Sequence, residues 1–539
     1  MVLISAAFIS TMPMAAEKLK VFIFAGQSNM VGSDSRASDI KLFPPFVGLD
    51  SPQTKVKFSY TIGREEKLSS TGWTDLQPIS NVVGPELSFA RKVAATTKAP
   101  IAIIKCAAGG TTLAVDWNPD QPGGFRLYPL ALSLVKSSLA ELDKKGIPYS
   151  IEGFMWHQGE NDMFNPEFKA NYAKNLKNFL SSWRRDLNTP KLKFYIGELC
   201  TKTVWGMDNR ENMYAIRAGQ LATIKEDKLA RYIPTSQNAV EIGGGAGLHY
   251  HYGTLGQLQH GIGYADAYLK DIGKLSVKQP SLKAWPYPKK SKVKLFVFAG
   301  HRNMEGERAF VQDLSRLAGS QTLAKPNPSI AFKYSIGGGY RTSMNWQPLS
   351  PVGISESFGP ELSFAAQLQK SSPDKFAILK FTDSGSQMND WTPEGTSATD
   401  RNVYQKFVSF VQNGIRDLQN KGHEVELAGV FYHVGENDMS FGPYRRQAAK
   451  WLQSLIVQSR RDLGLPNVKW FVSQQPPTED KGLNAIDVTK AISELALSET
   501  GVIHIKAFDL PKQPEQLVLN TQGVIHLGEL MAQSYLKQK

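Results

Sequence analysis

The stretch Val21–Gly32, VFIFAGQSNMVG, decides how the rest of the sequence is interpreted. Its β-branched and aromatic residues, Val21 to Phe24, predict a short buried strand. The strand leads directly into a small polar turn in which Gly26 is free to adopt a positive φ. Ligands of parallel α/β sheets lie outside the carboxyl ends of the strands, so Ser28 is expected where chemistry is usually done. A lone serine in such a turn is more often the cap of the next helix, and only the rest of the chain distinguishes the two roles.

The chain contains an internal repeat. VFIFAGQSNM at Val21–Met30 returns as LFVFAGHRNM at Leu295–Met304, and GPELSFA occurs unchanged at Gly84–Ala90 and Gly359–Ala365. Three further segments recur in the same order: AIIKCAAGGTTLAVDW (Ala102–Trp117) as AILKFTDSGSQMNDW (Ala377–Trp391), GFMWHQGENDM (Gly153–Met163) as GVFYHVGENDM (Gly429–Met439), and RRDL (Arg184–Leu187) again at Arg460–Leu463. Such matches in register do not arise by chance, so the sequence predicts two homologous domains.

Each copy alternates strands and helices, which favours a mainly parallel sheet flanked by helices. In the first copy the predicted strands are Leu19–Ala25, Ala102–Ala107, Ser150–His157 and Lys193–Leu199, and the predicted helices are Pro85–Thr97, Tyr128–Lys145, Pro166–Leu187, Asn212–Asp227 and Leu255–Lys270. Each copy has about 250 residues, which is large for this plan. We therefore expect insertions such as Ser35–Lys67 to decorate the sheet.

The sequence predicts four segments: a signal segment at 1–16, a first domain at 17–275, a linker at 276–292 and a second domain at 293–539. Val2–Ala16 is apolar and ends in small residues, like the end of a secretory signal, although it has no basic start. A core strand is the competing interpretation. The segment is too short to span a membrane, and no later run of about twenty apolar residues appears. We expect an exported protein, secreted or periplasmic, without a membrane span.

Composition limits the classes of partner and site. The 539 residues include 41% hydrophobic and 21% charged residues, which argues against extended disorder. The two cysteines, Cys106 and Cys200, provide neither a disulfide framework nor a cysteine zinc site. The net charge of +13 favours acidic surroundings such as anionic polysaccharide, although a solvated basic surface is the simpler explanation. The densest lysine cluster lies in the predicted linker without a nucleic-acid-binding motif, so no nucleic-acid partner is expected.

Three motifs of the first copy carry a family resemblance. Gly-Gln-Ser-Asn-Met follows the first strand, Gly-Gly-Thr follows a middle strand, and Trp-His-Gln-Gly-Glu follows the next. In this order they resemble the sialate O-acetylesterase-like group of the SGNH hydrolases, which overlaps carbohydrate esterase family six. The resemblance covers Lys18–Ile272. It implies tandem flavodoxin-like three-layer α/β/α domains and a serine esterase that removes acetyl groups from a carbohydrate, either a polysaccharide or a sialic-acid-type glycan, through an acyl-enzyme and without a cofactor.

The resemblance also implies the nucleophile and the oxyanion hole. Ser28 is the nucleophile by motif. Its own backbone N–H, that of Gly109 and the side-chain amide of Gln158 are the donors aimed at the oxyanion. Each such donor is typically worth about 3–4 kcal/mol in the transition state. Gly109 and Gly110 allow a backbone donor to approach the substrate without a Cβ in the way.

A histidine is expected as the general base. Members of the family carry it five residues before a glycine of the last helix, and Gly256 then indicates His251. His249 is the alternative, because it lies in a similar Leu-His-Tyr setting. His249, His251 and His260 are close in sequence, but no carboxylate or cysteine completes a metal set at ligand spacing, so no metal is predicted.

The acid that orients the histidine departs from the family pattern. Many relatives have aspartate three residues before the histidine, whereas this chain has Leu248. Other relatives use the glutamate of His-Gln-Gly-Glu, which is Glu160 here, and Glu241 is a weaker candidate. Glu160 has a counterpart, Glu436, in the second copy, so a scaffold role is equally open. A Ser–His dyad oriented by a backbone carbonyl is a further alternative.

The second copy has lost the implied catalytic residues. Arg302, Ser384, Val434 and Val518 stand in the places of Ser28, Gly109, Gln158 and His251, respectively. The surviving GPELSFA and GENDM motifs are then structural, and the second domain is predicted to be a degenerate pseudo-esterase. The alternative function is a non-catalytic carbohydrate-binding or scaffolding protein, in which Trp117 and Trp391 stack on sugar rings. Core packing is the competing role for both tryptophans.

Overall fold

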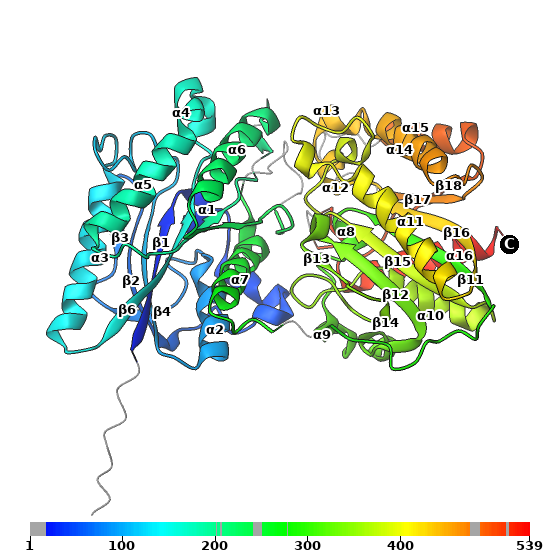
Figure 1. Cartoon of the computed structure of the whole chain (residues 1–539), viewed down its shortest axis with the longest axis horizontal. Coiled ribbons are helices and arrows are strands. Elements are labelled where there is room, and N and C mark those ends of the chain that lie inside the picture. The colour runs from blue at the N-terminus through cyan, green and yellow to red at the C-terminus, as the bar shows by residue number, and fades with distance from the viewer. Residues whose placement is uncertain are drawn as a thin grey trace, which may run out of the picture.

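The computed structural model describes residues 18–200, 202–204, 207–240, 251–276, 279–474, 486–513 and 517–538. Figure 1 shows two α/β units side by side, the first coloured blue to green and the second green to red. The predicted signal segment at 1–16 lies outside the described residues, as do Glu241, Leu248 and His249.

The first unit contains a mixed, mainly parallel sheet in the order β10-β7-β6-β1-β5-β2-β3, with β4 paired to β2. Its strands are β1 (Leu19–Gly26), β2 (Gln53–Ile62), β3 (Leu68–Ser69), β4 (Thr74–Leu76), β5 (Ile101–Ala107), β6 (Tyr149–His157), β7 (Phe194–Gly197) and β10 (Ala230–Ile233). Strand β1 lies at the centre and pairs in parallel with both β5 and β6. Only the short strands β3 and β4 run antiparallel to β2.

Helices cover both faces of this sheet. Its helices are α2 (Glu86–Thr97), α3 (Leu127–Lys144), α4 (Pro166–Ala170), α5 (Tyr172–Asp186), α6 (Arg210–Glu226) and α7 (Gly253–Asp271). Along β1, Phe22 and Phe24 pack with α2 and α7, whereas Val21 and Ile23 pack with α3, α5 and α6. Alternate residues of a strand point to opposite faces, so a strand buried on both sides is apolar throughout. The predicted three-layer α/β/α architecture is confirmed.

Two local expectations were wrong. The predicted insertion Ser35–Lys67 contains β2, which is a parallel strand of the main sheet. Its sequence, QTKVKFSYTI, mixes lysine, serine and threonine with apolar residues, so it lacks the continuous apolar pattern of the other strands. The predicted helix Pro166–Leu187 is divided at Asn171 into α4 and α5.

The second unit repeats this strand order, written here from the opposite edge of the sheet as β13-β12-β15-β11-β16-β17-β18, with β14 paired to β12. Its strands are β11 (Lys292–Gly300), β12 (Asn327–Ile336), β13 (Arg341–Thr342), β14 (Gln347–Leu349), β15 (Phe376–Thr382), β16 (Glu424–His433), β17 (Trp470–Gln474) and β18 (Val502–Lys506). Its main helices are α10 (Glu361–Ser371), α11 (Tyr404–Asn420), α14 (Ala448–Asp462), α15 (Ile486–Ser498) and α16 (Thr521–Leu536). The internal repeat therefore holds at the level of the fold.

Short elements complete the two units. They are α1 (Ser28–Val31), α8 (Arg302–Glu305), α9 (Val311–Leu314), α12 (Glu436–Met439), α13 (Gly442–Arg445), β8 (Thr203–Val204), β9 (Met207–Asp208), and the 3₁₀ helices η1 (Ala37–Leu42), η2 (Pro44–Phe46), η3 (Asp162–Phe164), η4 (Gln321–Ala324), η5 (Gly337–Gly339), η6 (Met388–Trp391) and η7 (Thr399–Arg401).

A buried ion pair explains the repeated GPELSFA motif. Lys105 Nζ, on β5, lies 2.8 Å from both carboxylate oxygens of Glu86 in the first turn of α2. In the second unit, Lys380 makes the same bidentate contact with Glu361 at 2.9 Å. Burial lowers the pKa of Lys105, and the charge of Glu86 opposes this shift. The motif therefore joins a strand to a helix in both units, as its survival in the second copy led us to expect.

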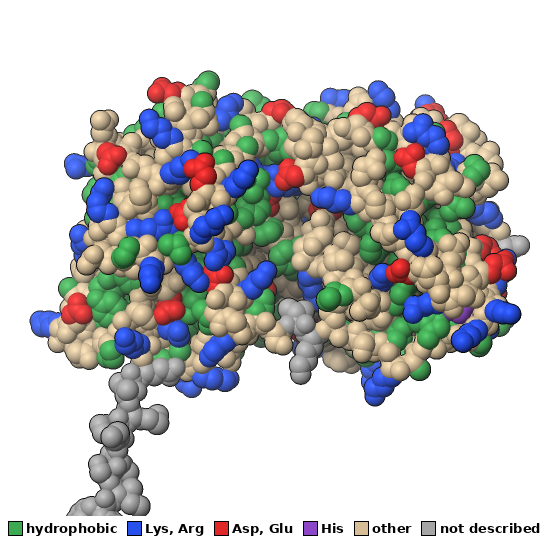
Figure 2. Space-filling view, in the orientation of Figure 1, with side chains coloured by type: hydrophobic (Ala, Val, Ile, Leu, Met, Phe, Trp, Pro, Cys, Tyr) green, Lys and Arg blue, Asp and Glu red, His purple; other side chains and the backbone are tan. Residues whose placement is uncertain are grey.

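The surface charge is dispersed. On the face shown in Figure 2, lysine and arginine side chains are spread over both units and intermixed with aspartate and glutamate. This face favours the simpler explanation of the net charge. Within the described ranges, every helix is too short or too polar to cross a membrane.

Candidate active site

The turn that carries Ser28 is set by close contact between β1 and β6. Gly26 has a φ of 153°, and a Cβ at this position would lie 2.0 Å from the carbonyl oxygen of His157, so only glycine fits. Gln27 N–H donates to the same carbonyl at 3.0 Å. Ser28 then starts α1 at the carboxyl end of the central strand, with 9% of its surface exposed.

Two backbone donors lie beside this serine. A Cβ at Gly109 would lie 3.5 Å from Ser28 Cβ, so the loop after β5 runs alongside the turn. Within the described part of the chain, neither Ser28 N–H nor Gly109 N–H donates to a protein acceptor. In the second unit, by contrast, Glu436 accepts hydrogen bonds from the N–H groups of Arg302 and Asn303, both at 3.0 Å. The N–H of Ser28 is therefore available for a ligand, whereas that of its counterpart Arg302 is used within the second unit.

The side-chain amide of Gln158, an expected oxyanion donor, is hydrogen-bonded within the protein. Its buried amide nitrogen donates to the carbonyl oxygen of Thr111 at 3.1 Å and to the carboxylate of Asp162. Both hydrogens of the amide are therefore used within the protein. Asp162 also accepts the N–H groups of Leu113 and Ala114, so this pair fixes the loop after β5.

His251 has a carboxylate partner that the sequence analysis missed. His251 Nδ1 lies 2.6 Å from Asp34 Oδ2. The imidazole is 13% exposed and the Asp34 side chain 59% exposed. The hydrogen bond from His251 is the largest influence on the pKa of Asp34 and lowers it, against the opposing effect of burial.

The internal repeat contained the signal for this residue. Asp34 follows Gly32 by two residues, and Gly32 matches Gly306 of the second copy, since both end the short helix with a positive φ. Two residues after Gly306 the second copy has Arg308. The second copy therefore lacks a carboxylate at the position of Asp34, as it lacks the serine and the histidine.

Glu160 is not the partner of His251, which corrects that expectation. Its Oε1 accepts a hydrogen bond from Asn29 Nδ2 at 2.7 Å and lies 3.4 Å from His157 Nε2. Burial raises the pKa of Glu160, but the contacts with His157 and Asn29 hold it below the usual value. Asn29 Oδ1 in turn accepts the N–H of Tyr252 at 3.2 Å. Glu160 thus supports a link between the serine turn and the residue after His251.

Asn161 was also missed. In the second unit its equivalent, Asn437, donates to the carbonyl of Ser384 and accepts from Arg302 Nε, so it bridges the two positions that match Gly109 and Ser28. In the first unit Asn161 Oδ1 accepts a hydrogen bond from Gln27 Nε2 at 3.1 Å. An amide at this position therefore belongs to the same small region as the serine turn.

Other candidate residues are removed from the site by burial. Trp117 and Trp391 are fully buried, so they pack in the cores and do not stack on sugars. Both cysteines are buried, and burial raises the pKa of Cys106 to about 12. Among the described residues, no cluster of three or more His, Cys, Asp or Glu side chains is placed to hold a metal ion.

Comparison with known proteins finds chains that are similar to about half of this one. A protein from Arabidopsis thaliana named "Probable carbohydrate esterase At4g34215" is 24% identical over 265 residues, which cover 47% of this chain and 91% of that protein. Its X-ray structure covers 47% of this chain and 99% of its own, with 22% identity and a TM-score of 0.37. The crystal structure of NanS covers 48% and 99%, with 17% identity and a TM-score of 0.37.

The family match extends over both repeats. The model of the family described as carbohydrate esterase, sialic acid-specific acetylesterase, matches residues 18–270 and 292–537. With well over half of the chain matched, and the serine turn and both sheets inside the matched ranges, this chain belongs to the sialic acid-specific acetylesterase family of carbohydrate esterases.

Proposed function

We propose that the first domain hydrolyses O-acetyl esters of a carbohydrate, with Ser28 as nucleophile, His251 as general base and Asp34 as the orienting acid. The substrate is an acetylated polysaccharide or a sialic-acid-type glycan. The contact between His251 Nδ1 and Asp34 Oδ2 at 2.6 Å carries the proposal, because it offers a carboxylate in place of the aspartate that many relatives have three residues before the histidine, where this chain has Leu248. A carboxylate that holds the histidine base is the arrangement of the Ser-His-Asp triad.

The reaction proceeds in two steps. Ser28 Oγ attacks the acetyl carbonyl while His251 Nε2 accepts the serine proton, and Asp34 stabilises the imidazolium through Nδ1. The tetrahedral intermediate collapses to an acetyl-serine, and His251 donates the proton to the departing sugar hydroxyl. Water then attacks the acetyl-serine with His251 again as base, which releases acetate and restores the serine.

Three donors would stabilise the oxyanion. The N–H groups of Ser28 and Gly109 have no acceptor within the described part of the protein and lie on adjacent segments. Asn161 is the third, because its Oδ1 accepts from Gln27 while its Nδ2 has no acceptor among the described residues and can donate to the substrate. This assignment replaces Gln158, whose amide hydrogens are already bonded.

The test is acetate release from p-nitrophenyl acetate and from acetylated xylan. S28A should abolish turnover, whereas S33A, at a partly exposed serine on the next turn, should retain it. Substantial turnover by a folded S28A protein would refute the assignment. A fluorophosphonate probe should label the wild type and S33A but not S28A. Absence of labelling in the wild type would favour the non-catalytic carbohydrate-binding alternative.

The second domain is proposed to lack this chemistry, and the protein is proposed to be secreted or periplasmic. The first proposal is supported by the replacement of the serine, the acid and the histidine by Arg302, Arg308 and Val518. The second is supported by the apolar stretch Val2–Ala16.

A further inference from the structure

The first domain covers the positions of the second domain that correspond to Ser28 and Gly109. Arg302 Nη1 donates to the carbonyl oxygen of Asn238 at 3.2 Å, and Ser384 Oγ donates to that of Gln237 at 3.2 Å. A Cβ at Gly385 would lie 2.1 Å from the carbonyl oxygen of Ser236. Arg302 is 2% exposed and Ser384 is fully buried. Arg302 and Ser384 therefore contact residues 237 and 238 of the first domain and are not open to a free sugar.

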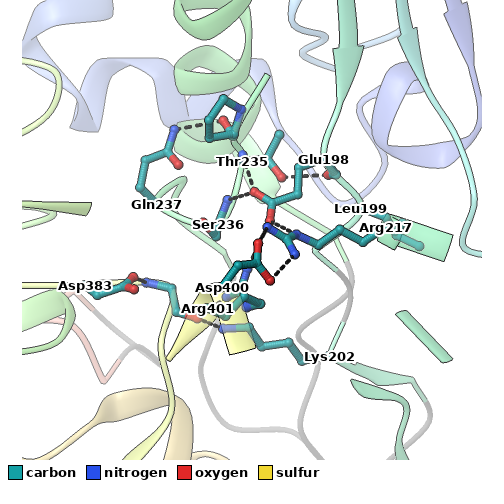
Figure 3. A network of polar contacts seen from close by, with 12 residues as sticks. Glu198, Leu199, Lys202, Arg217, Thr235, Ser236, Gln237, Asp383, Asp400 and Arg401 are labelled. Carbon is teal, nitrogen blue, oxygen red and sulfur yellow. Dashed lines mark hydrogen bonds and ion pairs between the residues drawn. The ribbon is translucent and has the colours of Figure 1, made fainter. Parts of the chain in front are cut away.

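The same segment is held from its other side by a buried carboxylate. Glu198 Oε2 accepts the N–H groups of Thr235 and Ser236 at 3.0 and 3.1 Å, and its carbonyl oxygen accepts Thr235 Oγ1 at 2.8 Å. Glu198 Oε1 accepts hydrogen bonds from Arg217 of the first domain at 2.9 Å and from Arg401 of the second at 3.0 Å. Figure 3 shows Glu198 between these groups.

The contact of Glu198 with residues 235 and 236 depends on the second domain, because Arg401 compensates the buried charge of Glu198. Burial raises the pKa of Glu198, but the attraction of Arg401 and Arg217 outweighs it and holds the pKa below the usual value. Asp400 completes the network with two contacts to the guanidinium of Arg217, at 2.9 and 2.6 Å. Removing one partner of a buried ion pair leaves an uncompensated charge, which is strongly unfavourable.

From Thr235 the contacts lead to the residue after His251. Tyr252 OH donates to Thr235 Oγ1 at 2.8 Å, and the ring of Tyr252 packs in a buried cluster with Val240 and Val518. Val518 belongs to the second domain and stands there in the place of His251. Tyr252 N–H is fixed on the other side by Asn29, the neighbour of Ser28. The second domain thus contacts the support of the histidine both directly and through Glu198.

The charged partners Arg401 and Glu198 have no charged counterpart at the equivalent position of the other copy. Tyr128 and Tyr404 are equivalent, since each donates to an aspartate of its own domain, Asp186 and Asp462. Three residues earlier, the second copy has Arg401 and the first has Phe125. The strand position of Glu198 is likewise glutamine, Gln474, in the second copy. The ion pair of Arg401 with Glu198 therefore has no equivalent formed from the matching positions, Phe125 and Gln474.

We propose that the second domain is a built-in positioning module, in which Arg401 and Val518 hold the segment 235–240 and Tyr252, and thereby hold His251 in register with Ser28. Both are positioning residues, because neither reaches the reacting atoms. The inference rests on the proposed function for its kinetic consequence. Its structural consequence, the fixing of Tyr252, is independent of the reaction.

The experiment uses full-length R401Q and V518A, with R461A as the control. Arg461 is a largely exposed arginine of the same domain that pairs with its neighbour Asp462. A displacement of His251 from Ser28 by a fraction of an ångström predicts a decrease in kcat of about 10- to 100-fold for R401Q, with a KM within about threefold of wild type. R401K, which restores the charge, should recover part of the loss.

Two further readouts separate positioning from general destabilisation. Hydrogen exchange of the Tyr252 amide should accelerate in R401Q and V518A but not in R461A. The rate of Ser28 labelling by the fluorophosphonate should fall in parallel with kcat. A lowered melting temperature with wild-type kcat and unchanged exchange at Tyr252 would overturn the inference. If R401Q fails to fold, V518A answers the same question. An inactive, unlabelled wild type would instead refute the proposed function, and the exchange measurement would still test the contact.

Discussion

His251 Nδ1 and Asp34 Oδ2 lie 2.6 Å apart although 217 residues separate them in sequence. Asp34 follows the short helix that begins at Ser28, whereas His251 precedes α7 at the other end of the domain. The acid and the base of the proposed reaction therefore meet only after the sheet has formed.

Substitution D34N should lower kcat by about 10²–10³-fold and change KM little. The amide no longer stabilises the imidazolium, although the exposure of Asp34 makes the loss smaller than for a buried acid. Steady-state kinetics on p-nitrophenyl acetate measure it. D39N, in the neighbouring 3₁₀ helix, is the control. A D34N enzyme with wild-type kcat would exclude Asp34 and return the choice to a Ser–His dyad.

N161A and Q158A should have different effects. Loss of one oxyanion donor predicts a fall in kcat of about 10²–10³-fold for N161A with little change in stability. Q158A instead leaves the buried Asp162 carboxylate with one hydrogen bond fewer, so it should lower the melting temperature. Comparing kcat per labelled serine with the melting temperature separates the two roles. Equal kcat losses per labelled serine would contradict this division.

G109A should impair the reaction without unfolding the protein. The added methyl group would lie 3.5 Å from Ser28 Cβ, which is an ordinary contact, but it would occupy the space that the substrate carbonyl needs. We expect kcat/KM to fall by about tenfold or more. Circular dichroism and the melting temperature should match the wild type. Full activity in G109A would show that the substrate does not approach this N–H.

K105M should destabilise the first domain by about 3–5 kcal/mol, because it leaves Glu86 buried without its partner. The double variant K105M/E86L removes both charges and should recover part of this loss. K380M provides the matched change in the second domain, where Lys380 pairs with Glu361. Urea unfolding of the full chain, followed by domain-specific tryptophan signals, measures each effect. Similar stability of K105M and the wild type would contradict a structural role for the ion pair.

The second domain should lose stability between pH 6.5 and 8. Burial raises the pKa of Glu305 and Glu436 to about 7 and that of Asp438 to about 8. In this range the unfolded chain has released these protons while the folded protein retains them, so the free energy of unfolding decreases as pH rises. The total effect is on the order of 1–3 kcal/mol.

The measurement is the melting temperature of the full chain at pH 6.5 and 8.0. D438N, which is neutral throughout, should reduce the difference between the two values. A difference of the opposite sign would show that these carboxyl groups are ionised in the folded state throughout this range.

The sequence alone determined the repeat, the parallel α/β/α architecture and the loss of candidate catalytic residues in the second copy. The architecture follows from local patterns, because apolar strands such as Val21–Phe24 form the centre of a sheet that is buried on both faces. The repeat follows from identical residues at equivalent positions of the two copies, which indicate common descent. The strand β2 was not predicted because its apolar residues, Val56 to Ile62, alternate with polar ones and do not form a continuous apolar run like that of β1. The proposed roles of Ser28 and His251 stay predictions.

Only the tertiary structure decided which groups are neighbours. Glu160 and Gln158 have the right chemistry near the serine turn, but their hydrogen bonds with Asn29 and Asp162 turn them toward the scaffold. Asp34 reaches His251 because chain reversal brings two ends of the domain together. The contact of Arg401 with Glu198 depends on the packing of two domains. Sequence spacing carries no information about such contacts, since they depend on directions in space that the whole fold sets.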